Sequence, residues 1–127
     1  MAAAGPGVKA VRLRLSGAAR ADIEDLLAWS EEHFGQAARQ RYEALLACAL
    51  RDVADDTCRP GIQARPELGA AVFSCHLVCS RQRVAAKVMR PRHLLVCRQA
   101  ASGVVDILRV LHDAMEISRH LPGGVLE

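Results

Sequence analysis

The sequence predicts an α+β fold in which a single β-sheet carries a helical hairpin on one face. Three observations support this: strand-like alternation at the start, two consecutive segments with helical periodicity between residues 16 and 58, and short strand-like segments between 70 and 111. The chain has 127 residues, of which 51% are hydrophobic and 24% are charged. This size and composition predict one domain over residues 1–127, with frayed tails at 1–7 and 123–127.

The first half of the chain predicts one strand and two helices. Residues 8–15 end in alternation, with leucines on one side and arginines on the other, as in a half-buried strand. Ser16 offers an N-cap oxygen for a first helix, which Gly35 is suited to end. Apolar residues then recur at helical spacing from 38 to 53, and this second helix ends before Pro60.

The second half predicts strands at 70–80, 93–98 and 104–111, with a basic connector at 81–92 and a short helix at 113–121. The expected architecture is therefore an N-terminal strand, a helical hairpin, a three-stranded antiparallel continuation of the same sheet and a short C-terminal helix. We expect the whole sheet to be antiparallel.

Charge is strongly segregated, although the net charge is only +3. Residues 16–56 contain nine acidic and four basic residues, and we interpret them as solvated helix faces. Six cations and no carboxylate lie between residues 81 and 98, namely Arg81, Arg83, Lys87, Arg90, Arg92 and Arg98. This run is typical of a surface that attracts an acidic protein or, second, a nucleic acid. With only four aromatic residues, the chain lacks the side chains that stack on bases, so no direct specific binding of nucleic acid is expected.

The five cysteines form no CxxC pair, and their odd number favours free thiols. Cys75, His76 and Cys79 are close enough in sequence to suggest a metal site. On a strand, however, the two cysteines share one face and the histidine points the other way, so no metal is expected. No cofactor is expected either. Residues 1–7 do not resemble a signal peptide, and no apolar stretch is long enough to span a membrane, so we expect a cytoplasmic protein.

Three segments in register carry a family resemblance, which extends from about Val11 to Pro122. They are Leu13-Arg14-Leu15-Ser16-Gly17-Ala18-Ala19 followed by Asp22-Ile23-Glu24, then Phe34-Gly35 with Ala38, and then Ile107-Leu108-Arg109-Val110-Leu111-His112-Asp113 followed by Ser118-Arg119-His120-Leu121-Pro122. In these segments the chain resembles the ParE branch of the RelE/ParE toxins of bacterial type II toxin–antitoxin systems. The resemblance implies a RelE/ParE-like fold, in agreement with the order of elements predicted above.

The resemblance implies two possible activities. ParE-type toxins inhibit DNA gyrase and so block replication, and a ParD-like antitoxin neutralises them in a hetero-oligomer. RelE-type toxins are ribosome-dependent endoribonucleases that cleave messenger RNA. RelE-like members use a tyrosine near the C-terminus, and this chain has no aromatic residue after Phe73. The side chains therefore favour a gyrase inhibitor without catalytic residues. The ribonuclease remains the alternative, because His112 and His120 keep an acid–base route open, and a homologue that has lost its activity is a third possibility.

The candidate contact residues for the target or the antitoxin are the six cations between 81 and 98, together with Arg109 and Trp29. Strand alternation places Arg109 outward between Leu108 and Val110, which is equally compatible with an ordinary solvated position. Trp29 lies off the apolar stripe of its helix and so is a candidate anchor for an antitoxin, although packing within the hairpin is the simplest role for Trp29, Phe34 and Tyr42. The C-terminal motif consists of Arg109, His112, Asp113, Arg119 and His120. Within it we expect His112 to bond into the strand–helix corner and Asp113 to cap the last helix.

Overall fold

Segments from both ends of the chain meet in one five-stranded sheet. The computed structural model describes residues 12–85 and 87–115. Its strands are β1 (Arg12–Leu15), β2 (Ile62–Ala64), β3 (Val72–His76), β4 (His93–Ala101) and β5 (Val104–His112). They lie in the order β1-β5-β4-β3-β2. The α+β class, the helical hairpin and the antiparallel series formed by β3, β4 and β5 are confirmed.

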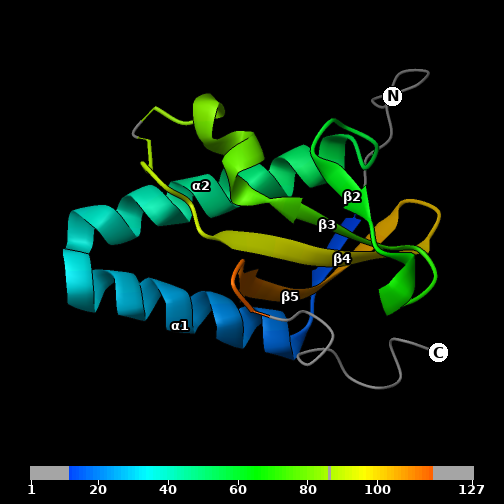
Figure 1. The fold of residues 1–127 in the computed structure, drawn as a ribbon, viewed down its shortest axis with the longest axis horizontal. Coiled ribbons are helices and arrows are strands. Elements are labelled where there is room, and N and C mark those ends of the chain that lie inside the picture. The colour runs from blue at the N-terminus through cyan, green and yellow to red at the C-terminus, as the bar shows by residue number, and fades with distance from the viewer. Residues whose placement is uncertain (1–11, 86, 116–127) are drawn as a thin grey trace.

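The hairpin consists of α1 (Gly17–Phe34) and α2 (Gln36–Asp55), which pack side by side against one face of the sheet (Figure 1). Ser16 caps α1, since its hydroxyl oxygen accepts a hydrogen bond from the backbone N–H of Ala19 at 2.9 Å. Gly35 joins the helices with a φ of +93°, a conformation that favours glycine. The cap and the stop predicted from the sequence are therefore confirmed.

The expected antiparallel sheet is wrong at one edge, because β1 runs parallel to β5. Leu15 is paired with Ile107, and the backbone N–H of Ser16 donates to the carbonyl of Ile107 at 3.0 Å. The hairpin and three strands lie between β1 and β5 in sequence. This long crossover allows the two strands to run in the same direction, as a tight turn could not.

The predicted strand at 70–80 ends early, at His76, and is followed by the 3₁₀ helix η2 (Leu77–Arg83). The His76 ring nitrogen Nδ1 accepts from the N–H of Val78 at 3.0 Å and so caps this turn. The expectation that Cys75 and Cys79 share a strand face is therefore wrong, because only Cys75 lies on the strand. Two short elements, β2 and the 3₁₀ helix η1 (Pro66–Leu68), were not predicted.

The main core lies between the hairpin and the sheet, where leucines of the helices meet residues such as Leu95, Ile107 and Val110. A smaller cluster on the other face includes Leu94, Val96 and Leu108. A bulge in the β4–β5 ladder places Leu108 and Val110 on opposite faces. The regular alternation expected through Arg109 is therefore wrong.

Several expectations concern parts of the chain outside the described residues. They are the frayed tails, the start of the first strand before Arg12, and the helix predicted at 113–121 beyond Met115. Within the described part, Asp113 to Met115 form a turn, and the N–H of Met115 donates to the carbonyl of His112 at 2.9 Å. Neither α1 nor α2 combines the length and hydropathy needed to cross a membrane.

Candidate functional site

A groove of about 850 Å³ opens between the helical hairpin, the loop from Lys87 to Arg92 and the ends of β4 and β5. Its walls are mainly apolar. The residues that line it are Leu26, Trp29, Ser30, Phe34, Ala38, Arg41, Tyr42, Lys87, Val88, Met89, Arg90, Arg92, His93, His112 and Met115. A groove of this size, with few polar groups at its base, has the general character of a binding site.

Exposed hydrophobic side chains are concentrated in this groove. Within residues 12–85 and 87–115, five large hydrophobic side chains are exposed, and four of them line it: Trp29 (53%), Phe34 (68%), Met89 (79%) and Met115 (45%). Trp29 stacks on His33 and meets the edge of Phe34 at ring-centroid distances of 4.2 and 5.6 Å. The predicted exposure of Trp29 is confirmed. Phe34 is not a core residue, but its ring does pack against Trp29 within the hairpin. Such a cluster is typical of a surface that a partner covers.

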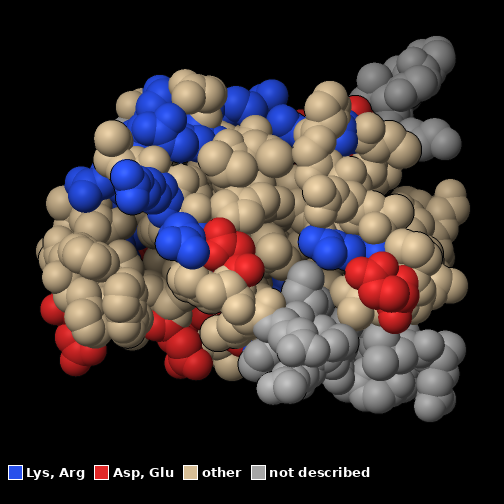
Figure 2. Space-filling view, in the orientation of Figure 1, with Lys and Arg blue, Asp and Glu red and all other residues tan. Residues whose placement is uncertain are grey.

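Among the described residues, the charged side chains that line the groove are basic: Arg41, Lys87, Arg90 and Arg92. Figure 2 shows basic side chains gathered over the upper part of this face, near α2 and the loop. Acidic ones lie at the lower left, along α1, and in smaller groups at the centre and the right of the view. Cations around an apolar wall attract carboxylates and orient an approaching anionic partner.

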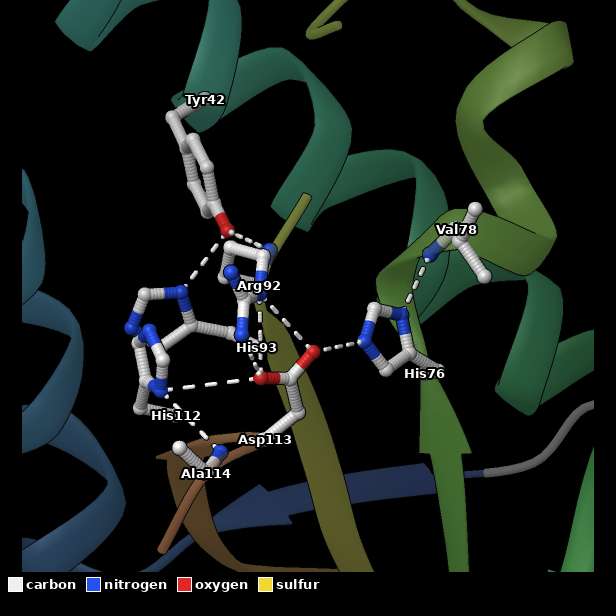
Figure 3. Close-up of polar contacts among 8 residues, drawn as sticks. All are labelled: Tyr42, His76, Val78, Arg92, His93, His112, Asp113 and Ala114. Carbon is white, nitrogen blue, oxygen red and sulfur yellow. Dashed lines mark hydrogen bonds and ion pairs between the residues drawn. The ribbon is translucent and has the colours of Figure 1, made fainter. Parts of the chain in front are cut away.

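The base of the groove is polar. The Tyr42 hydroxyl accepts from the backbone N–H of Arg92 at 3.2 Å and lies 2.8 Å from Nδ1 of His93, to which it can donate (Figure 3). The His93 and His112 rings meet edge to face, with centroids 5.4 Å apart. Burial raises the pKa of Tyr42. Burial and the neighbouring His112 lower the pKa of His93 to about 4, so His93 is neutral near pH 7.

Asp113 joins the ends of three strands next to this base. Its carboxylate accepts from the Arg92 guanidinium at 2.9 Å and from Nε2 of His76 at 2.9 Å (Figure 3). Hydrogen bonds from Arg92 and His76 hold the pKa of Asp113 well below its usual range. The helix that Asp113 was expected to cap extends outside the described residues, and within them the Asp113 carboxylate pairs with two basic groups. His112 accepts from the N–H of Ala114 at 3.1 Å, so it does bond into the turn after β5.

Arg109 lies away from the groove and is turned toward α1. Its guanidinium donates to the Asp22 carboxylate at 2.7 and 2.9 Å, and the side chain is 20% exposed. The backbone N–H of Val110 donates to the same carboxylate at 2.9 Å. The structure therefore favours a role in joining β5 to α1 over an exposed contact.

Comparison with protein families matches residues 13–117 to the model described as the ParE toxin of the type II toxin–antitoxin system, parDE. The chain belongs to the ParE toxin family. Comparison with curated proteins gave no match. ParE toxins work in type II systems, in which an antitoxin is the partner.

In this ParE toxin the basic run from 81 to 98 does not form one patch. Lys87, Arg90 and Arg92 line the groove. Arg83, at the end of η2, instead pairs with Asp52 of α2 at 3.2 Å. Arg98 lies elsewhere, 3.4 Å from Asp106. Arg81 donates to a backbone carbonyl of the loop. Arg119 and His120 lie outside the described residues.

Several residues of this groove carry only weak signals in the sequence. Met89 and Met115 each lie next to a charged residue, and exposed methionines are common on adaptable binding surfaces. Tyr42 and His93 are separated by 51 positions and meet only in the fold. No group of three or more metal-ligating side chains with the arrangement of a metal site is present among the described residues.

Proposed function

We propose that this ParE-family toxin inhibits DNA gyrase by binding it, and that a ParD-like antitoxin neutralises the toxin by covering the groove. The observation that carries the proposal is the character of the groove. It brings together four exposed hydrophobic side chains and four cations, and none of the described residues that line it is a carboxylate. This combination suits an acidic protein partner with an apolar face.

The hydrophobic residues are suited to act as anchors. Trp29 offers a large exposed ring held in place by His33 and Phe34, and tryptophan is among the residues that contribute most when an interface buries them. Met89 and Met115 can adjust to the shape of a partner, because methionine is flexible and polarizable. The rim cations then contribute to the rate and orientation of encounter.

The antitoxin segment that fits this groove is an amphipathic one with carboxylates beside its apolar stripe. Apolar side chains would meet Trp29 and Met89, and carboxylates would meet Lys87 and Arg90. We expect the segment to be disordered alone and to fold when it binds, so the groove supplies the apolar surface that the segment lacks.

The polar groups beside the groove support binding over acid–base chemistry. A ribonuclease of this fold needs a base and an acid with free positions toward the substrate. Both ring nitrogens of His76 are engaged, one with Val78 and one with Asp113. Asp113, with a lowered pKa, is a weak base. Nδ1 of His93 is taken by Tyr42.

Supercoiling by purified gyrase tests the proposal directly. The wild-type chain should inhibit it. Trp29→Ala should weaken inhibition by about 30-fold or more, as expected for an anchor residue. Lys87→Ala and Arg90→Ala should each weaken it by about two- to fivefold, and the pair by more. Arg20→Ala, an exposed arginine on α1 outside the groove, is the matched control and should change nothing.

Induction of the toxin in bacterial cells separates the alternatives. Growth arrest with an SOS response supports gyrase as the target. Arrest with transcript cleavage, no SOS response and unaffected supercoiling would replace gyrase inhibition by the ribonuclease. The absence of any arrest would indicate an inactive homologue. Pull-down of the chain from its native cell should recover a small antitoxin, and recovery of the toxic chain alone from healthy cells would contradict neutralisation by a partner.

A further inference from the structure

One wall of the groove is a loop without regular secondary structure. The residues from Val84 to Arg92, of which residue 86 is outside the described part, connect η2 to β4 and pass beside α2 (Figure 1). Val88 and Met89 stand at the middle of this loop and line the groove. They belong to no sheet ladder. Val88 packs against the main core, and hydrogen bonds to the loop add to what holds the wall in place.

Hydrogen bonds hold the loop at several points, including one from the N–H of Asp113 to the carbonyl of Arg92 at 2.7 Å. At its two ends, Lys87 donates to the carbonyl of Val84 at 3.4 Å, and the N–H of Arg92 donates to the Tyr42 hydroxyl at 3.2 Å. In the middle, Nε of Arg81 donates to the carbonyl of Val88 at 2.6 Å. A second guanidinium nitrogen of Arg81, Nη2, lies 3.8 Å from the sulfur of Met89. The bond to Val88 is short, as charge-assisted hydrogen bonds are.

We propose that Arg81 is a positioning residue for partner binding. It fixes Val88 and Met89 as the wall of the groove and does not itself touch the partner. This inference rests on the proposed function, in which the groove receives an apolar, acidic segment. It also separates Arg81 from Lys87 and Arg90, which line the groove and act through their charge.

The guanidinium group is specifically suited to this task. Its planar fork reaches the Val88 carbonyl and the Met89 sulfur at the same time, whereas a lysine ammonium is a single point charge on a flexible stem. Arginine and lysine should therefore differ at position 81 although their charge is the same. At a position that acts only through its charge, arginine and lysine should give the same affinity for the partner.

Arg90 provides the matched comparison within the same loop. It is exposed and lines the groove, and it makes no side-chain hydrogen bond or ion pair with any of the described residues. Its effect on an anionic ligand should be weakened by salt and preserved by lysine. The effect of Arg81 should be insensitive to salt and lost with lysine.

The first measurement reports the loop without any ligand. The chain has three methionines, so ¹³C-methyl spectra of the full-length protein are simple to assign. Arg81→Gln and Arg81→Lys should both shift and narrow the Met89 methyl signal while the Met115 signal stays in place. Arg90→Gln should leave the Met89 line width unchanged. An unchanged Met89 signal in both Arg81 variants would overturn the proposal.

The second measurement uses anilinonaphthalene sulfonate as the probe, because it combines apolar rings with one anionic group. Trp29 is the only tryptophan and lines the groove, so energy transfer from it reports binding there. At about 50 mM and about 500 mM NaCl alike, Arg81→Gln and Arg81→Lys should weaken binding by about tenfold. Arg90→Gln should weaken it only at low salt, and Arg90→Lys should restore it.

Thermal unfolding is the control for folding: each variant should unfold in a cooperative transition like that of the wild type. Full affinity in Arg81→Lys, or an Arg81→Gln effect that disappears at high salt, would show that Arg81 acts by charge and would overturn the proposal. Failure of the wild-type chain to bind the probe would count against the groove as an apolar–anionic site, and so against the proposed function. The Met89 signal would still decide the role of Arg81.

Discussion

Acidification should destabilise the toxin through His93, well above the pH at which carboxylates titrate. The pKa of His93 is lowered to about 4 in the folded protein, because the ring is partly buried and lies beside His112. In the unfolded chain the same group has a pKa of about 6.5. Between these values the unfolded state binds more protons, so the free energy of unfolding decreases as the pH falls from about 6.5 to about 4.

The two pKa values give the size of the effect. At pH 7 His93 is neutral in the folded state and about a quarter protonated in the unfolded state, so the loss of stability is still only about 0.2 kcal/mol. At about pH 5 the folded state should have lost about 2 kcal/mol, and by about pH 4 about 3 kcal/mol. Protonation also conflicts with the hydrogen bond in which Nδ1 accepts from the Tyr42 hydroxyl. These values are a large fraction of the stability of an ordinary domain.

Urea unfolding of the wild-type chain and of His93→Gln at pH 7 and at pH 5 measures the effect. At pH 7 the variant should have a lower free energy of unfolding than the wild type, because it loses the contact with Tyr42. Between pH 7 and pH 5, however, its free energy of unfolding should decrease by about 2 kcal/mol less than that of the wild type. His33→Gln is the matched control, since His33 is an exposed histidine on α1. If the wild type and His93→Gln lose the same free energy between the two pH values, the assignment of this pH dependence to His93 is wrong.

Other substitutions test the remaining parts of the structure. Asp52→Ala should lower the free energy of unfolding by about 3–5 kcal/mol in urea titrations, because the buried carboxylate pairs with Arg59 at 2.7 Å and accepts from Ser80 at 2.6 Å. Gly61→Ala should lower the melting temperature, since the φ of Gly61 is +97° and a Cβ would lie 2.4 Å from the Cys79 sulfur. Adding Cys79→Ala to this variant should recover part of the lost melting temperature, and no recovery would refute the steric explanation. Thiol titration of the denatured protein without reductant should find five free thiols, in keeping with burial, which raises the pKa of Cys75 to about 11; stoichiometric zinc would contradict it.

The parts of the fold that sequence alone predicts are those with strong local signals. The capping hydroxyl of Ser16 and the stop at Gly35 act within one turn of the chain, and both are confirmed. The strand that ends at His76 illustrates the limit. Its apolar run continues to Val78, whereas in the structure the backbone turns into η2 after His76, where the N–H of Val78 donates to the His76 ring. The parallel pairing of β1 with β5 is likewise decided by contacts between distant segments.

The candidate site shows the same division. Trp29 could be identified because it lies off the apolar stripe of its helix, and its exposure is confirmed. The cations from 81 to 98 could be identified as a basic run. Sequence could not tell which of them line the groove and which form ion pairs, because their partners are remote in sequence. Arg83 meets Asp52 on α2, and Arg109 meets Asp22 on α1. Such pairs depend on tertiary packing, which periodicity does not report.

The pairing of β1 with β5 has a consequence for how the protein is made. Residues 12–15 pair with residues 104–107, so β1 has no neighbour in the sheet until β5 has been synthesised. Chains emerge from the ribosome at about 5–20 residues per second, so the N-terminal strand remains without its partner for several seconds. A nascent or truncated chain that lacks β5 also lacks the aspartate-binding Arg109 and the strand that joins β1 to β4. The toxin therefore acquires its native sheet only after β5 has been synthesised, and fragments that end before β5 lack the strand that lies between β1 and β4.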